Sequence, residues 1–128
     1  MAIKRYSKQR ELIYQAVLNT TEHPTAEMVY KWLKPENASL SLGTVYRNLN
    51  QLADEGSIVR IPLPVERFDG RIEPHAHFMC RCCGNVFDLM DIGYDRSLDK
   101  KVEKSTGHTV SEHKLIFDGT CANCADQN

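Results

Sequence analysis

The sequence has no long apolar run, no internal repeat and no low-complexity tract. None of its hydrophobic stretches approaches the ~20 residues that a membrane-spanning helix needs. Its first residues, MAIKRYSKQRELI, are basic but lead into no apolar segment, so they do not form a secretory signal. The glycine-rich motif of nucleotide-dependent redox enzymes is also missing. With 41% hydrophobic and 26% charged residues, the chain is expected to be a cytoplasmic globular protein.

The sequence also lacks an excess of basic or of acidic residues. The 128 residues include 16 Lys/Arg and 17 Asp/Glu, a formal net charge of −1, which favours no particular partner. The charge is unevenly spread: residues 1–63 hold eight basic and six acidic side chains (+2), and residues 64–128 hold eight and eleven (−3). The first ten residues include four basic side chains and no acid, which is compatible with binding a polyanion.

The sequence has five cysteines, an odd number. In a reducing compartment an odd set is a poor basis for disulfides and favours metal binding. Four of the five form two CxxC pairs: Cys80 with Cys83, and Cys121 with Cys124. Because each CxxC turn offers two thiolates to one tetrahedral ion, two turns complete a closed four-cysteine zinc site with a structural role. A redox-active CxxC pair is the alternative interpretation.

Cys82 is left over from this arrangement. It is adjacent to Cys83 and cannot easily join the same tetrahedron. It is therefore interpreted as a bystander thiol, with an alternative zinc ligand or a site of oxidative cross-linking as the other two interpretations. The 37 residues between the CxxC pairs fit a strand–helix–strand excursion that returns the second pair to the first.

Apolar residues recur at helical spacing in three segments of the first half: 8–19, 25–34 and 41–56. In the third segment Ser41 is a candidate N-cap and Gly56 a C-terminal stop. A loop is expected at 35–37, and two short strands are expected at 57–64 and 65–68. Three helices followed by a β-hairpin predict a winged helix-turn-helix domain, in which the third helix would read DNA.

The polar face of the third helical segment carries side chains that suit DNA. Arg binds phosphate or guanine, Asn binds adenine, and Tyr or Thr contacts phosphate or a thymine methyl group. The candidate DNA-binding residues on this face are Thr44, Tyr46, Arg47 and Asn48. The alternative is a helical bundle whose polar face is only solvated.

The second half is expected to contain strands at 77–80 and 85–92, a charged amphipathic helix at 94–107 and a third strand at 108–119. Such a β-β-α-β unit is too small to be very stable alone, so it should need a metal, a partner subunit or both. We therefore predict an α+β chain with a winged-helix DNA-binding domain at 1–67, a hinge at 68–72, and a small α/β dimerisation and metal-binding domain at 73–128.

His75 and His77 form a His-x-His pair. On a strand, residues two apart share one face, so both imidazoles would point the same way. Asp88 is expected on the neighbouring strand. By spacing alone, the pair is either part of a metal site or two satisfied surface histidines.

Five stretches of the sequence occur in a familiar order: EHPTAEMVY, SLGTVYRNLNQL, RFDG, HAHFMCRCCGNVFDLMD and GTCANC. In this order they resemble the ferric uptake regulator family of bacterial metal-dependent repressors, and most of all its peroxide-sensing branch. The resemblance runs from about residue 5 to residue 124, whereas family members usually carry a further helix ahead of it. It implies a homodimeric repressor of a palindromic double-stranded DNA operator, not an enzyme, with neither membrane nor small-molecule substrate other than peroxide as the signal.

The resemblance also implies two metal ions per chain. One is the structural zinc already expected at the four cysteines. The other is a regulatory Fe(II) or Mn(II), whose ligands would be His23, Asp69, His75, His77 and Asp88; oxygen and imidazole ligands suit these ions. Ligands from both halves of the chain would fix the angle between them, and so the spacing of two recognition helices in a dimer.

In the resembling proteins, iron-mediated oxidation of a ligand histidine releases the repressor from DNA. The matching oxidation targets are His23 and His75. On the DNA side, the resemblance supports Tyr46 and Arg47, and we add the basic residues near the N-terminus: Arg5, Lys8 and Arg10.

Two details bear on the subtype. The peroxide-sensing branch resembles this sequence in having Asp at position 88, where iron sensors commonly have Glu. Position 76, inside the His-x-His pair, is Ala, where iron sensors tend to have an acid. His113 and Asp95 match only part of an additional site of those relatives, which argues against a second regulatory metal.

Three other functions remain in competition. The nearest is an iron- or zinc-responsive repressor that uses the same ligands without sensing peroxide. A redox enzyme built on Cys82 or a CxxC pair is the second. The third is a protein-interaction module held by zinc that binds no DNA.

Overall fold

The computed structural model describes residues 2–126, with side chains described from Lys8 onward. The chain divides into two compact units, Met1–Ile72 and Glu73–Asn128, and each is described by itself. Within residues 2–126, none of the helices combines the length and apolar character needed to cross a membrane.

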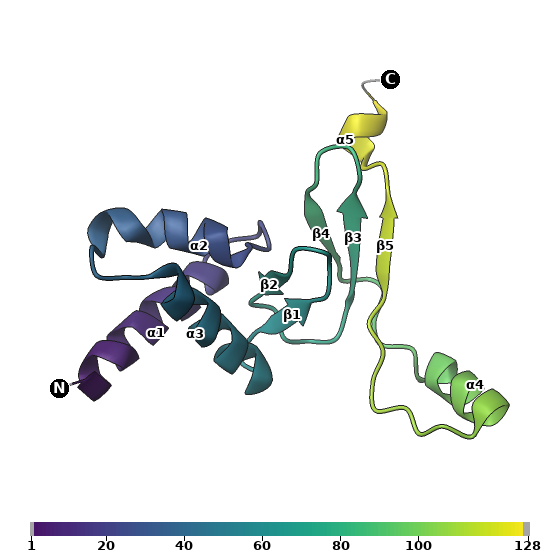
Figure 1. Ribbon diagram of the computed structural model, residues 1–128. Coiled ribbons are helices and arrows are strands. Elements are labelled where there is room, and N and C mark those ends of the chain that lie inside the picture. Colours follow the sequence, from purple (N-terminus) through teal and green to yellow (C-terminus); the bar gives the residue numbers. More distant parts are fainter. Residues whose placement is uncertain (1, 127–128) are drawn as a thin grey trace. The chain divides into compact units, whose positions relative to one another are not determined.

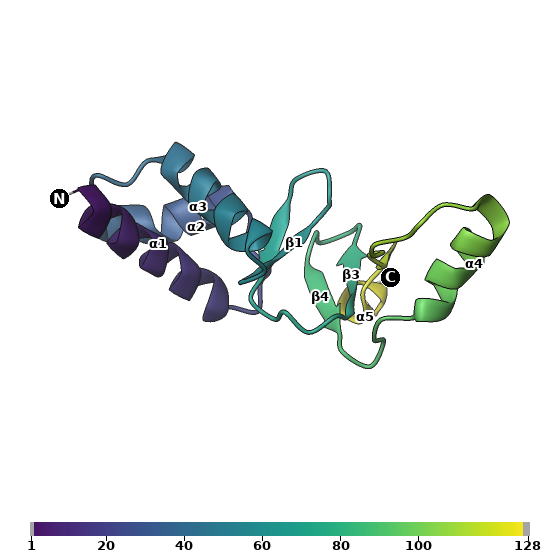
Figure 2. The same ribbon diagram turned by 90° about the horizontal axis from the view of Figure 1, so that it is seen from below.

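Unit 1 is helical and ends in a β-hairpin (Figure 1). Its elements are α1 (Ala2–Leu18), α2 (Ala26–Leu33), the 3-10 helix η1 (Lys34–Glu36), α3 (Leu42–Asp54), β1 (Val59–Ile61) and β2 (Arg67–Asp69). Strands β1 and β2 pair antiparallel, with Arg60 opposite Phe68. Helices α1, α2 and α3 pack against one another (Figure 2). These are the parts of a winged helix-turn-helix domain.

Side-chain caps and an apolar stripe explain the helices of unit 1. Thr25 caps α2 by accepting the Met28 N–H, and Ser41 caps α3 by accepting the Thr44 N–H. The apolar stripe of each helix faces the interior. The buried core comprises Ile13, Val17, Ala26, Val29, Leu40, Val45, Leu49, Leu52, Ile58 and Phe68.

Unit 1 differs from the expectations at three places. Helix α1 begins at Ala2, ahead of the predicted residue 8. Residues 34–36 form a 3-10 turn, where a loop was expected from 35, because Pro35 is tolerated in the first turn of a helix. The second strand of the hairpin, predicted over 65–68, is β2 at Arg67–Asp69, and Phe68 in it is buried in the core.

Unit 2 is built on a three-stranded sheet with the order β4-β3-β5. Its elements are β3 (Ala76–Cys80), β4 (Val86–Leu89), α4 (Arg96–Thr106), β5 (Ile116–Gly119) and α5 (Ala122–Ala125). Strand β4 pairs with β3 antiparallel, and β5 pairs with β3 in parallel. Helix α4 stands away from the strands in both views and contains no buried residue (Figures 1 and 2).

The strand predicted over residues 108–119 was wrong for its first eight residues. Only Ile116–Gly119 pair with β3, whereas residues 108–115 form no strand. The reason is tertiary, because the His113 backbone N–H donates to the Tyr94 hydroxyl near α4 and not to a strand. The short helix α5, which follows Cys121, was not predicted. The predicted fold class, a helical N-terminal domain followed by an α/β domain with a cluster of four cysteines, is confirmed.

Candidate metal centres

Four cysteines meet at one end of the sheet of unit 2. Cys80 ends strand β3, Cys83 lies in the following turn, and Cys121 and Cys124 flank the start of α5. Their sulfur atoms all lie within 4.8 Å of one another. Parallel pairing of β5 with β3 places Gly119 beside Cys80, and this register brings the second CxxC pair to the first.

The sulfur cluster fits a zinc ion. Zinc–sulfur bonds of about 2.3 Å at tetrahedral angles separate neighbouring sulfurs by about 3.8 Å. The Cys83 and Cys121 sulfurs are 3.9 Å apart. Backbone N–H groups of Cys121 and Cys83 donate to the Cys80 sulfur at 3.3 and 3.4 Å. These bonds, that of Cys121 first, lower the pKa of Cys80 to about 6 and favour the thiolate that binds metal.

Cys82 is exposed, beside this cluster. Hydrogen bonding with Cys121, and next with Cys82, raises the pKa of the Cys124 thiol. Cys82 is not among the four mutually close sulfurs.

A group of histidine and aspartate side chains lies toward the other end of strand β3. His77 on β3 is directly opposite Asp88 on β4. One carboxylate oxygen of Asp88, Oδ1, lies 2.7 Å from His75 Nε2 and 3.2 Å from His77 Nε2. The two imidazole rings are 4.5 Å apart between centroids. The predicted His-x-His pair and Asp88 are thus brought together within unit 2.

His23 and Asp69 form a second pair, within unit 1. His23 Nε2 is 3.6 Å from Asp69 Oδ2, and both residues are buried. His23 has a φ of 54°, a left-handed conformation that is uncommon for a residue other than glycine. The surroundings hold it there: the Arg67 guanidinium donates to the His23 carbonyl, and the Phe68 N–H donates to the Pro24 carbonyl. Strained residues held in this way cluster at functional sites.

The donor chemistry of both groups fits a divalent ion such as Fe(II) or Mn(II). Each group offers imidazole nitrogen and carboxylate oxygen, the ligands that these ions accept, and neither contains sulfur. Burial of His23, Asp69 and His77 keeps competing water away from these donors. Each unit therefore carries one part of the donor set that the family resemblance implies.

The four candidate DNA-binding residues of α3 divide into two kinds. Tyr46 and Arg47 are exposed. Thr44 and Asn48 are 8% and 7% exposed, and the Asn48 amide donates to the Thr44 carbonyl within the helix. The tertiary fold thus presents Tyr46 and Arg47 to solvent and places the other two behind them.

The basic residues of α1 are held differently from one another. Lys8 is exposed, whereas the Arg10 guanidinium binds both carboxylate oxygens of Glu55, at the end of α3. The side chain of Arg5 lies outside the described residues. Glu55 was missed by the sequence analysis because a partner 45 positions away leaves no local signal.

His113 pairs with Asp99, whereas Asp95, the other residue matched to the additional site of relatives, does not pair with it. His113 Nδ1 is 2.6 Å from Asp99 Oδ1, the Tyr94 hydroxyl donates to the same carboxylate, and the Tyr94 and His113 rings stack at 4.3 Å. These bonds, that of Tyr94 first, lower the pKa of Asp99. Asp95 instead caps α4 by accepting the Ser97 N–H.

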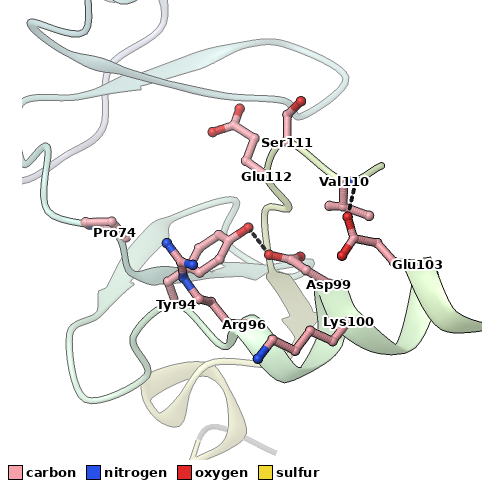
Figure 3. A pocket seen from close by; sticks show the side chains of 9 residues that line it. All are labelled: Pro74, Tyr94, Arg96, Asp99, Lys100, Glu103, Val110, Ser111 and Glu112. Atoms are coloured by element: carbon pink, nitrogen blue, oxygen red, sulfur yellow. Dashed lines mark hydrogen bonds between the residues drawn. The ribbon is translucent and has the colours of Figure 1, made fainter. Parts of the chain in front are cut away.

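This cluster borders an open polar cavity of about 500 Å³ in unit 2, shown in Figure 3. Its wall carries both charges, with Arg96 and Lys100 close to Asp99, Glu103 and Glu112. The Glu103 carboxylate accepts the Val110 N–H and ties α4 to the following segment. The lining thus mixes two basic side chains with three acidic ones.

A winged helix-turn-helix unit joined in one chain to a unit with four clustered cysteines and His/Asp donors defines a metal-dependent transcriptional regulator. Residues 2–118 match the Ferric uptake regulator family, and the chain belongs to that family. Transcription regulators of this family are not enzymes, and they bind DNA operators as dimers.

Relatives support the same assignment over nearly the whole chain. The peroxide operon regulator of Bacillus subtilis (strain 168) is 32% identical, over 94% of this chain and 84% of that protein. The solved structure of the Campylobacter jejuni peroxide stress regulator matches with a TM-score of 0.74 at 29% identity, over 94% of this chain and 91% of that one. The Helicobacter pylori ferric uptake regulator shares the fold, with a TM-score of 0.72 at 23% identity over 98% and 87%.

Proposed function

We propose that the protein is a peroxide-responsive repressor, in which Fe(II) or Mn(II) promotes operator binding and iron-mediated histidine oxidation causes release. The observation that carries this proposal is the shared Asp88 oxygen, which both His75 and His77 approach within 3.2 Å. Peroxide regulators among the relatives add support, at 32% and 29% identity.

His23 and Asp69 from unit 1, and His75, His77 and Asp88 from unit 2, are the proposed ligands of one regulatory ion. By ligating it together, the two sets of residues would hold the two units at one angle. In a homodimer that angle sets the spacing of the two α3 helices, which must match half-sites about one DNA turn apart. Metal binding and operator binding would then strengthen each other by the same factor.

When bound, ferrous iron would activate hydrogen peroxide beside these ligands, so that one peroxide oxygen is inserted into an imidazole C–H bond and the other leaves as water. His23 and His75 are the proposed acceptors of the oxygen atom. Both side chains are almost completely buried, at 3% and 1% exposed, so bulk solvent does not intercept the oxidant. An oxidised imidazole is a poorer ligand, and its loss would release the angle between the units.

DNA, a second copy of the chain and zinc are the proposed partners. Tyr46 and Arg47 on α3 are the proposed direct DNA contacts, with Lys8, Arg5 and Arg10 toward phosphate. Homodimerisation is proposed through unit 2, where apolar side chains are exposed: Met90, Ile92, Val102 and Phe117. A structural zinc at the four cysteines would hold unit 2 together, and the protein would act in the cytoplasm.

Anaerobic loading with Fe(II) followed by dilute hydrogen peroxide tests the proposal. Mass spectrometry of peptides should find one added oxygen on His23 or His75, and a gel shift with the promoter fragment next to its own gene should be lost in parallel. The peptide with exposed His108 is the internal control, and Mn(II)-loaded protein should bind DNA without oxidation. Metal-dependent DNA binding that survives peroxide, with no added oxygen, would favour the iron- or zinc-responsive repressor instead.

A further inference from the structure

The Arg47 side chain folds back along α3 toward the start of the helix. Its Nη2 donates to the Thr44 hydroxyl at 3.1 Å. That hydroxyl lies 2.9 Å from the hydroxyl of Ser41, the N-cap, which also accepts the Thr44 N–H. A chain of hydrogen bonds therefore runs from the helix cap to an exposed guanidinium. Side chains on a helix lean toward its N-terminus, which makes this path short.

Gly43 leaves the room that this path needs. A Cβ atom added at Gly43 would lie 3.3 Å from Arg47 Nη1, closer than most such contacts, and 4.0 Å from the Ser41 hydroxyl. A side chain at position 43 would therefore require the guanidinium to shift by a few tenths of an ångström from the place in which it bonds Thr44. Glycine lowers the stability of a helix, and Gly43 lies in the first helical turn of α3. No chain reversal at this position requires a glycine.

We propose that Thr44 and Gly43 are positioning residues for DNA recognition by Arg47. Thr44 is 8% exposed and acts through the arginine rather than by touching DNA. The inference rests on the proposed function, because it assigns a role within operator binding. Holding the guanidinium before DNA arrives reduces the rotamer freedom that a long arginine side chain would lose on binding.

The position reached by the guanidinium also suggests its ligand. The first turn of a helix has N–H groups directed outward and a positive partial charge, and both favour phosphate. With Arg47 held near that turn by Thr44, a phosphate bound there would meet both the guanidinium and the positive end of the helix. The chemical class of the ligand is thus a DNA backbone phosphate, and the contact should be made on any duplex sequence.

The test uses the full zinc-containing chain loaded with Mn(II), and two duplexes of equal length: the promoter fragment of its own gene and an unrelated sequence. Arg47→Ala should weaken binding to both and reduce the slope of affinity against salt by about one. Thr44→Val should weaken binding about fivefold, the equivalent of one hydrogen bond, without changing that slope. Thr44→Ser, which keeps the hydroxyl, should restore binding.

Gly43→Ala gives the sharpest outcome, because stability and binding should move in opposite directions. Alanine favours the helix, so the melting temperature should rise, while displacement of Arg47 should lower DNA affinity severalfold. In an Arg47→Ala background, neither Gly43→Ala nor Thr44→Val should weaken binding further. Gly93→Ala is the matched control, since an added Cβ there meets no atom within 4 Å.

Two results would overturn the inference while leaving the proposed function intact. One is a Gly43→Ala protein that binds DNA as tightly as the wild type. The other is a Thr44→Val effect of equal size with and without Arg47. A Mn(II)-loaded wild type that binds neither duplex would overturn the proposed function and this inference together.

Discussion

His75 and Asp88 lie 2.7 Å apart, from the imidazole Nε2 to the carboxylate Oδ1, and the same oxygen is 3.2 Å from His77 Nε2. One carboxylate oxygen therefore organises both imidazoles of unit 2. Asp88 reaches them from the neighbouring strand, in the register that sets His77 opposite Asp88. Removing its charge should affect metal binding more than removing any other carboxylate of this unit.

Asp88→Asn is therefore expected to weaken Mn(II) binding ~10-fold or more, since a neutral amide of nearly the same size replaces an anionic ligand. DNA binding that depends on Mn(II) should be lost with it. The zinc content should stay at one ion per chain, because the four cysteines lie at the other end of strand β3. Calorimetric titration with Mn(II) and metal analysis of the purified protein measure the two effects.

Asp91→Asn is the control for that variant. Asp91 follows β4 in an exposed turn three residues further along the chain. It should bind Mn(II) as the wild type does. Equal loss of Mn(II) affinity in the two variants would show a general charge effect and contradict a specific role for Asp88.

The four cysteines lead to a second prediction, on stability. Helix α4 contains no buried residue and β5 pairs only with β3, so unit 2 has few apolar contacts of its own. Cys121→Ser should abolish tight zinc binding, and unit 2 should unfold at a lower denaturant concentration than unit 1, because zinc binding contributes directly to folding free energy. Hydrogen exchange of residues 73–126 measures this separately from the helical unit.

Cys82→Ser is the matched variant, because Cys82 is a neighbouring thiol outside the four clustered sulfurs. It should retain one zinc per chain and the exchange protection of the wild type. Loss of zinc in Cys82→Ser but not in Cys121→Ser would reassign the ligands. Stable unit 2 in the zinc-free Cys121→Ser protein would contradict a structural role for the metal.

The pair of Arg10 with Glu55 leads to a third prediction, on DNA binding. Both carboxylate oxygens of Glu55 accept from the Arg10 guanidinium, and this hydrogen bonding lowers the pKa of the Glu55 carboxyl, so it is charged at neutral pH. Arg10 is thereby partly neutralised. Glu55→Gln should raise affinity for duplex DNA and make its salt dependence steeper by up to about one, as for one additional phosphate contact.

Glu11→Gln tests whether this effect is specific. Glu11 is also exposed on α1 next to Arg10, but it accepts a hydrogen bond from Gln15. Its substitution should raise DNA affinity less than Glu55→Gln does. Fluorescence anisotropy at several salt concentrations compares them, and an unchanged salt slope in Glu55→Gln would remove Arg10 from the DNA interface.

Much of the fold followed from short-range patterns. Apolar spacing with Thr25 and Ser41 as caps predicted α2 and α3 within a few residues of their bounds, because helices and caps depend on neighbours three or four positions away. The CxxC spacing likewise predicted the cluster of four cysteines, since a turn of four residues is local. Resemblance to a family added Asp69 and His23, which no spacing singled out.

Other features, namely side-chain partners and burial, could not be predicted from the sequence. The partner of His113 is Asp99 on α4, and residues 108–115, which were predicted as part of a strand, form no strand. The burial of Thr44 and Asn48 depends on how α3 packs against its neighbours. The first kind of contact joins positions that are far apart in the sequence. The second depends on which face of a helix packs against its neighbours, and residue type alone does not predict that face.

Local chemistry was thus sufficient to recognise helices, caps and cysteine turns, and the family was recognised from the resemblance of five ordered motifs. Packing was needed to separate the exposed polar residues of α3 from the buried ones, and to pair Arg10 with Glu55 across 45 positions. The physical reason is range: capping and periodicity act over one helical turn, whereas ion pairs and burial arise only once distant segments lie against each other.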